Sequence, residues 1–201
     1  MDVPLEHFAV WLHRYYTACA LVTHILRFYE AILKIREDHG KLRIYDAKVQ
    51  EWFTRFPDSD GFHATLLLGK WCGCDKIPSK IKFWYANNPE GAPLPQQDVF
   101  ISTPNDANLR AHCWFFMPFG NLDVDLTYEQ FHADRDASCI LFSGGHHPFE
   151  VEESWELLQH NRESRVSFHE ILRREMTWGE LPEETRTLLE KVYAVIQSEI
   201  R

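Results

Sequence analysis

The chain has 201 residues and a formal net charge of -9; 45% of its residues are apolar, 14% aromatic and 25% charged. This length fits one large domain or two small ones, and the aromatic share can fill a sizeable core. The acidic balance disfavours nucleic acid as a partner, because binding to phosphate backbones needs clustered Lys and Arg.

The start of the chain and its cysteines indicate a soluble, cytoplasmic protein. Met1 is followed by Asp2 and Pro4, not by a basic and then apolar leader. Charged residues or histidines interrupt every apolar stretch within about ten residues, so we expect no membrane span. The odd number of cysteines favours free thiols over a disulfide framework. They are Cys19, Cys72, Cys74, Cys113 and Cys139.

The first quarter of the chain reads as helical. Apolar residues recur with a helical period over residues 4–39, and Gly40 is a candidate C′ glycine. The run is long enough for two helices, and Thr17 is the candidate internal N-cap. Residues 46–56 predict a short helix capped by Asp46, and a turn cluster follows at 57–61.

The middle of the chain reads as strands and the end as helices. An exposed loop is expected at 86–97, where three prolines and a glycine fall. Helix, then strands, then helix is an α+β order. We therefore predict one α+β domain over 1–201: a helical part at 1–56, a sheet part at 62–142 and a helical extension at 150–201. The individual predictions are strands at 62–68, 81–85, 98–102 and 138–142, and helices at 166–174 and 182–200.

A hairpin in the sheet part carries the residues of chemical interest. The stretch HCWFFMPFGNLDVDLTYEQF, residues 112–131, predicts two antiparallel strands around a turn at 117–120 or 118–121. The first register places His112 opposite Asp125, and the second places it diagonally from Asp125. Either brings the imidazole within reach of that carboxylate. Asp123 lies nearer Phe116, toward the turn.

The same hairpin resembles the second half of the transglutaminase-like branch of the papain-like cysteine enzymes. The residues that carry the resemblance are His112 and Trp114 in the first strand, and Asp125 and Thr127 in the second. The resemblance implies a papain-like or transglutaminase-like fold, with N-terminal helices packed on an antiparallel sheet. It also implies a nucleophilic cysteine earlier in the chain, at the start of a helix.

The favoured hypothesis from the resemblance is a Cys-His-Asp enzyme that transfers or hydrolyses an acyl group through a thioester. Cys19 is the candidate nucleophile, His112 the base and acid, and Asp125 the residue that orients it. Trp114 and Trp84 are candidates for binding a protein or peptide substrate. No cofactor and no metal are expected.

The assignment of Cys19 depends on where its helix begins. A helix that starts at Thr17 would place Cys19 in its first turn, where the helix dipole favours the thiolate. A helix that runs through Thr17 would remove that advantage. Cys72 and Cys74 do not precede a predicted helix, Cys113 alternates away from His112, and Cys139 follows the histidine in the chain. His13 stands where papain-like enzymes often carry a glutamine six residues before the cysteine.

Two other functions remain open. A non-catalytic interaction module could keep the fold and present the aromatic segments 83–95 and 114–120. A metal-dependent hydrolase could use Cys72 and Cys74 together with histidines, although a single close cysteine pair is a weak zinc signature. Those histidines are His132, His146 and His147. In the module, Cys19 is a plain apolar residue and His112–Asp125 a structural pair.

Overall fold

The computed structural model describes residues 5–57, 61–85, 109–117, 121–131, 140–143 and 171–200. Its helical elements and strands make an α+β fold, as the sequence predicts. The helices are α1 (Leu5–Glu37), α2 (His39–Leu42), α3 (Ala47–Arg55), α4 (Gly61–Trp71) and α6 (Glu183–Ile200), with 3-10 turns η2 (Tyr128–Phe131) and η3 (Trp178–Glu180). The strands are β1 (Ile77–Tyr85), β2 (Leu109–Met117), β3 (Leu122–Val124), β4 (Leu141–Ser143) and β5 (Leu172–Met176).

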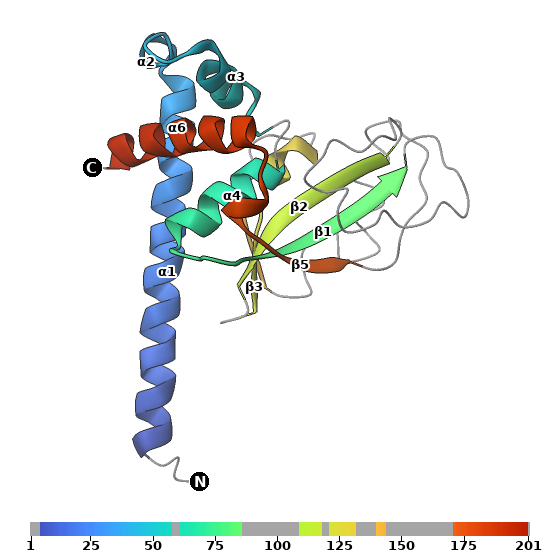
Figure 1. Cartoon of the computed structure of the whole chain (residues 1–201). Coiled ribbons are helices and arrows are strands. Elements are labelled where there is room, and N and C mark those ends of the chain that lie inside the picture. The colour runs from blue at the N-terminus through green and yellow to red at the C-terminus, as the bar shows by residue number, and fades with distance from the viewer. Residues whose placement is uncertain are drawn as a thin grey trace.

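The strands form one antiparallel sheet in the order β4-β3-β2-β1-β5. In Figure 1 the sheet lies to one side of the helices, and α4 lies between the sheet and α6. Because side chains alternate along a strand, the sheet has two different faces. Ile81 and Cys113 are partners on the face that packs on α4, whereas Lys82 and His112 are partners on the other face.

The hairpin has the second of the two predicted registers. Phe116 pairs with Asp123 and Met117 with Leu122, which confirms that Asp123 lies nearer the turn. β3 is shorter than expected and ends at Val124, so Asp125 follows the strand. β2 therefore extends beyond β3, and β3 does not pair with the first half of β2.

Of the two possibilities that the sequence left open at Thr17, the structure has the continuous helix. α1 runs without a break from Leu5 to Glu37, and its N-terminal half extends beyond the other helices in Figure 1. The helix first contacts α4 where His24 stacks on Trp71, with ring centroids 4.4 Å apart. The predicted role of Gly40 is wrong: it lies inside α2, which Asp38 caps through Lys41 N. Asp46 caps α3 as predicted and accepts from Val49 N at 3.0 Å.

The predicted strand at 62–68 is a helix. Residues 64–69 of α4 are all buried, so this short apolar run carries neither a helical stripe nor a strand alternation. The helix lies against β1 and β2 on one side and α1 and α6 on the others. Its approach to β1 needs Gly69, because a Cβ there would lie 2.5 Å from Ile77 Cγ1.

The C-terminal part of the chain, predicted as a helical extension, contains a strand as well as a helix. Residues 172–176, which overlap the predicted helix at 166–174, form the edge strand β5, and residues 151–170 lie outside the described part. The predicted helix at 182–200 is confirmed as α6, with Pro182 just before it. α6 packs back on α1, α3 and α4 and buries Leu189, Val192 and Ile196. Residues 141 and 142 of the predicted strand at 138–142 belong to β4, and residues 138 and 139 lie outside the described part. The loop at 86–97 and the strand at 98–102 also lie outside it.

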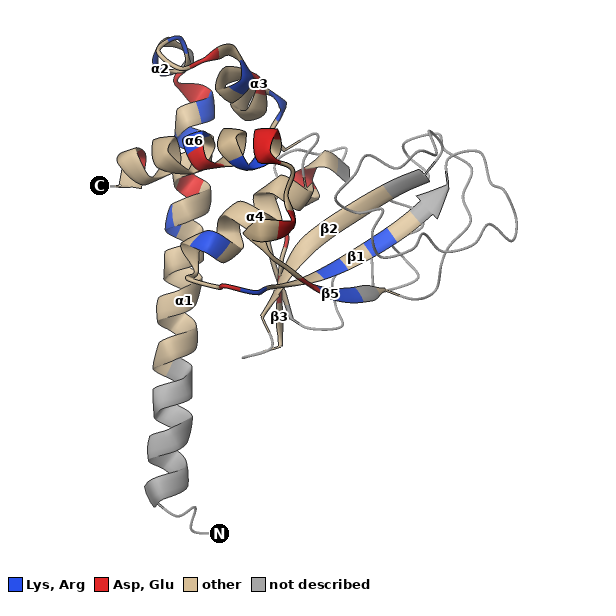
Figure 2. Ribbon diagram, in the orientation of Figure 1, with Lys and Arg blue, Asp and Glu red and all other residues tan. Residues whose placement is uncertain are grey.

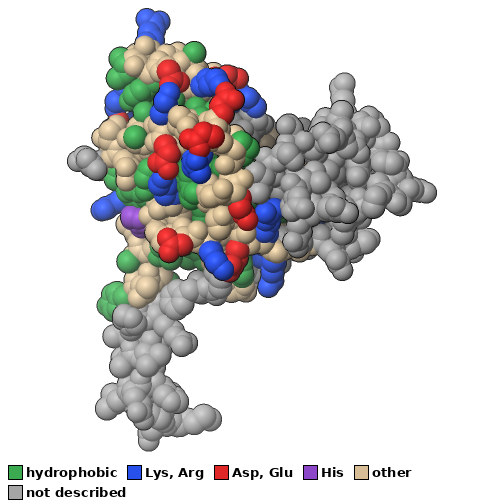
Figure 3. Space-filling model, viewed as in Figure 1, with side chains coloured by type: hydrophobic (Ala, Val, Ile, Leu, Met, Phe, Trp, Pro, Cys, Tyr) green, Lys and Arg blue, Asp and Glu red, His purple; other side chains and the backbone are tan. Residues whose placement is uncertain are grey.

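Ion pairs surround the apolar contact of α6. Lys41 pairs with Glu199, Lys191 with Asp46 and Lys70 with Glu190, so α6 is linked to three other helical segments. Both signs of charge alternate over this side of the molecule in Figures 2 and 3. Ion pairs that water reaches contribute little individually, and the buried apolar stripe of α6 supplies most of the stabilisation.

Replacing Gly69 by alanine should disrupt the contact between α4 and β1. The added methyl group would overlap Ile77, so we expect a loss of about 1–3 kcal/mol in the free energy of unfolding. Urea denaturation followed by circular dichroism measures it. The matched control is Gly40→Ala, where the nearest atom, Asp38 Oδ1, is 3.5 Å away and the effect should stay below about 1 kcal/mol. Equal effects of the two substitutions would contradict this packing.

Candidate active site

His112 and Asp125 form the hydrogen-bonded pair that the hairpin predicts. His112 Nε2 lies 2.6 Å from Asp125 Oδ2, and both residues are at most 2% exposed. The other carboxylate oxygen, Oδ1, accepts from the backbone N–H of Thr127 at 3.0 Å and from its hydroxyl at 3.1 Å. The Asp-x-Thr spacing thus closes a local turn that fixes the carboxylate toward the imidazole.

The other ring nitrogen of His112 faces η2 and the start of α4. Gln130 Nε2 lies 3.2 Å from His112 Nδ1. With the amide nitrogen on that side, Nδ1 accepts and Nε2–H donates to Asp125, which is the tautomer of a general base. A Cβ at Gly61, the first residue of α4, would lie 3.4 Å from the same Nδ1. Neither neighbour was predicted from the sequence. Residues 62–68 were predicted as a strand, so no helix start was expected beside His112.

Contacts from α1 fix the position of η2. The Tyr29 hydroxyl donates to Glu129 Oε1 at 2.9 Å, next to the glutamine that contacts His112. Burial and the Glu129 carboxylate both raise the pKa of Tyr29, so the phenol remains a donor at neutral pH. The long N-terminal helix therefore supports the histidine site through a hydrogen bond, although its cysteine is elsewhere.

Asp123 belongs to a second buried cluster on the same face of the sheet. Lys80 Nζ lies 2.9 Å from Asp123 Oδ1 and 3.0 Å from Oδ2, and Trp114 Nε1 donates to Oδ1 at 3.2 Å. Lys80, Trp114 and Asp123 are each at most 1% exposed. The Trp114 ring also stacks on His112, with centroids 5.8 Å apart. Trp114 thus contacts both Asp123 and the histidine that Asp125 binds. These contacts give no direct support for its predicted role in substrate binding.

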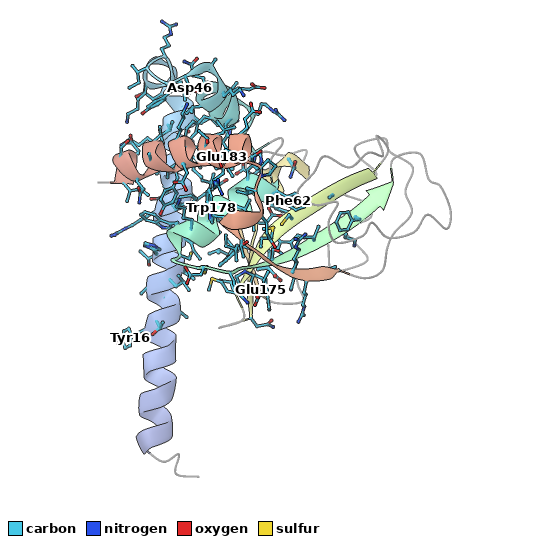
Figure 4. The ribbon with its side chains drawn as sticks, in the orientation of Figure 1. Tyr16, Asp46, Phe62, Glu175, Trp178 and Glu183 are labelled. Atoms are coloured by element: carbon cyan, nitrogen blue, oxygen red, sulfur yellow. The ribbon has the colours of Figure 1, made fainter. Side chains whose placement is uncertain are left out.

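The four described cysteines lie away from this arrangement. Cys19 is exposed in the middle of α1, one turn beyond Tyr16, which Figure 4 shows on the projecting part of that helix. Cys72 follows the end of α4, about 16 Å along the axis from the residue that faces His112. Cys74 lies two residues further on. Cys113 points to the opposite face of the sheet, as predicted, and burial raises its pKa to about 12.

The remaining sequence candidates that the structure describes are not part of this site. Burial raises the pKa of Cys72 to about 12, so it is a poor thiolate donor for a metal. No group of three or more His, Cys, Asp and Glu side chains within the described ranges could hold a metal ion. The side chain of Trp84, and residues His132, Cys139, His146 and His147, lie outside those ranges. His63, predicted in a strand, lies in the first turn of α4.

A pocket opens beside the start of α4. It has a volume of about 80 Å³, and its buried floor includes Leu66 and Met176. Figure 4 shows Phe62 and Trp178 near this part of the molecule, with Glu175 of β5 below them. The pocket is lined by Phe62, His63, Leu66, Arg174, Met176, Thr177, Glu180, Leu181, Pro182 and Thr185.

Comparisons of the chain with family models, with characterised proteins and with solved structures give no match. In addition, no helix in the described part of the chain is long and apolar enough to cross a membrane.

Removing the buried lysine should cost far more than removing an exposed one. Lys80→Met leaves Asp123 buried without its cation, and we expect a loss of about 3–5 kcal/mol in the free energy of unfolding. The control is Lys76→Met in the same loop-to-strand region. Lys76 and Glu175 are 3.4 Å apart and mostly exposed, so that change should cost less than about 1 kcal/mol. Denaturant titration measures both. Similar losses in the two variants would show that the buried pair is not a structural requirement.

Proposed function

We propose that this chain is a non-catalytic interaction module that keeps the arrangement of a transglutaminase-like thiol enzyme. The observation that carries the proposal is the separation of the described thiols from the base. His112 is oriented by Asp125 at 2.6 Å, yet Cys19 is exposed on α1 and Cys72 lies at the far end of α4. A nucleophile must come within hydrogen-bond reach of its base.

The buried network explains why such a site would persist without turnover. Asp125 accepts three hydrogen bonds, and its partners His112 and Thr127 come from both sides of the hairpin. Loss of either partner would remove hydrogen bonds from a buried carboxylate, at a cost of about 1–3 kcal/mol. The dyad therefore has a structural value that does not depend on catalysis.

The pocket beside α4 is the binding surface that we assign to the module. Its floor is apolar, its rim carries Arg174 and Glu180, and it adjoins β5, an edge strand among the described strands. An extended peptide can pair with an edge strand and insert alternate side chains into a neighbouring pocket. The partner we propose is therefore a peptide segment with an aliphatic side chain.

The second candidate is the thiol-dependent acyl transferase or amide hydrolase. The short His112–Asp125 contact favours it, because the same tautomer serves a base that accepts a proton from a thiol. This candidate requires a cysteine that reaches His112 Nδ1, and thiol labelling of the whole chain distinguishes the two functions.

Iodoacetamide labelling with mass mapping should find no activated thiol in the natural chain. At pH 6 to 7 we expect Cys19 to react at about the rate of a model thiol, because it is exposed and lies in mid-helix. Cys72 and Cys113 should react far more slowly, since burial raises the pKa of each thiol to about 12. Any cysteine of the full chain that reacts about tenfold faster than the model thiol would refute the module and support the enzyme.

A small peptide analogue tests the pocket. N-acetyl-leucine methylamide at millimolar concentration should shift the methyl resonance of Met176, which lines the pocket, and leave that of Met117 in place. We expect a dissociation constant on the order of 1 mM for one inserted side chain. N-acetyl-glycine methylamide is the ligand control. Thr185→Trp should block the shift by filling the pocket, whereas the exposed Thr187→Trp should not. A shift that persists in Thr185→Trp contradicts this binding site.

A further inference from the structure

The N-terminal half of α1 carries an apolar stripe that the described part of the structure leaves exposed. Cys19 is exposed, Leu26 is 37% exposed and Val22 is partly exposed. On another side of the same helix, Ile25 and Phe28 lie in the core and are fully buried. In Figure 1 this half of α1 lies away from the other helices. The helix therefore carries two apolar stripes, and the described core uses the one through Ile25 and Phe28.

The exposed stripe has the spacing of a coiled-coil seam. Between residues 5 and 26, apolar residues recur in alternate steps of three and four, over three heptads. A repeat of about 3.5 residues keeps such a seam facing a second helix along its length, here about 33 Å. The seam residues are Leu5, Phe8, Leu12, Tyr15, Cys19, Val22 and Leu26.

The polar residues of this segment lie where a coiled coil requires them. All five charged residues and histidines between residues 5 and 26 fall at the three heptad positions farthest from the seam. They are Glu6, His7, His13, Arg14 and His24. The seam and the positions directly beside it are therefore free of charge, as a helix–helix contact needs.

The seam is complementary in size to itself when a second copy runs antiparallel. In the register that places Phe8 opposite Cys19 of the partner, every layer joins a larger residue to a smaller one. A parallel pair would instead stack Phe8 on Phe8 and Cys19 on Cys19, which combines overpacking with a cavity. The other antiparallel layers are Leu12 with Tyr15 and Leu5 with Val22.

The positions beside the seam follow the same rule. In this register Trp11 lies next to Ala18 of the partner, and Ala9 lies next to Tyr16, which is 64% exposed in the single chain. The segment contains four aromatic residues, all on or beside the seam. At about 150–250 Å² each, they supply most of the about 800 Å² per partner that a stable interface buries.

A membrane surface fits the segment less well than a second copy does. A helix that lies in a membrane interface combines its apolar face with a strongly basic polar face. Between residues 5 and 26, the Lys, Arg, Asp and Glu residues are Glu6 and Arg14, whose charges cancel. The segment therefore has no net charge that would attract it to anionic lipid.

We infer that two copies of this chain associate through an antiparallel coiled coil of α1, in which Phe8 of each copy packs against Cys19 of the other. The association also stabilises the projecting half of α1, because a helix in water gains most of its stability from packing its apolar face. The inference goes beyond the proposed function, since the peptide pocket lies between α4, β5 and the start of α6.

The mass of the chain in solution tests the association. At about 100 μM, sedimentation equilibrium of the natural chain should give twice the chain mass of 23.8 kDa. Leu12→Glu should raise the dissociation constant at least about 100-fold, because it places a carboxylate in each of two central apolar layers. The matched control is Thr17→Glu, an exposed residue at the heptad position opposite the seam, which should remain dimeric.

Three results of this experiment overturn the inference. They are a natural chain with the mass of one copy, a Leu12→Glu chain that remains dimeric, and equal dissociation of the two variants. A monomeric natural chain that binds vesicles of phosphatidylserine and phosphatidylcholine assigns the stripe to a membrane surface and overturns the inference as well.

A disulfide between copies tests the register. With glutathione disulfide as the oxidant, Phe8→Cys should form a bond between residue 8 of one copy and Cys19 of the other, which mass mapping identifies. The two thiols lose two protons and two electrons to the oxidant, which becomes two glutathione thiols. Val10→Cys, at the heptad position opposite the seam, should form no such bond. A bond from Cys19 to Cys19 in the natural chain would show a parallel pair and overturn the inference.

Protection of Cys19 separates this inference from the proposed function. The iodoacetamide rate of a model thiol is expected for Cys19 in the single chain, below the dissociation constant. Above it the rate should fall about tenfold in the natural chain, because the partner covers the thiol, and stay constant in Leu12→Glu. A rate that does not depend on concentration overturns the dimer and leaves the interaction module standing. A native thiol about tenfold faster than the model thiol refutes the module and leaves the dimer to be decided by its mass.

Discussion

Two buried carboxylates bind side chains from neighbouring strands and so hold the sheet together. Asp123 and Asp125 are both at most 1% exposed, and each is satisfied by partners from other parts of the chain. Asp123 binds Lys80 of β1 and Trp114 of β2, whereas Asp125 binds His112 of β2 and the turn that follows β3. A buried charge without partners is costly, so strand order and register are tied to these contacts.

Other segments of the chain meet His112 beyond the end of β3. β3 ends at Val124, so among the described strands none lies beside the first half of β2 on that side. The turn at Thr127, the 3-10 turn η2 and the first residue of α4 converge there on His112. Gln130 of η2 and residue 61 of α4 thus lie beside the imidazole at the part of β2 that β3 does not pair with.

Sequence reasoning succeeded where a residue's chemistry restricts its neighbours. The hairpin, the side of β2 that Cys113 faces, the contact of His112 with Asp125 and the cap at Asp46 all follow from alternation or from short-range hydrogen bonding. It failed for α4, where a run of apolar residues is buried on every side and shows no period. It left the continuity of the first helix at Thr17 open, since a possible cap residue inside a long helical pattern does not by itself end a helix.

The sequence by itself determined the α+β class, the hairpin register to within one of two choices, and the pairing of His112 with Asp125 rather than Asp123. Strand alternation and the Asp-x-Thr spacing are local, so they can be read from neighbouring residues. The tertiary structure alone decided which helix start faces the imidazole. That contact joins residues 61 and 112, which are far apart in the chain, and depends on the packing of α4 on β2. No local pattern encodes such packing, so this contact could not be predicted from neighbouring residues.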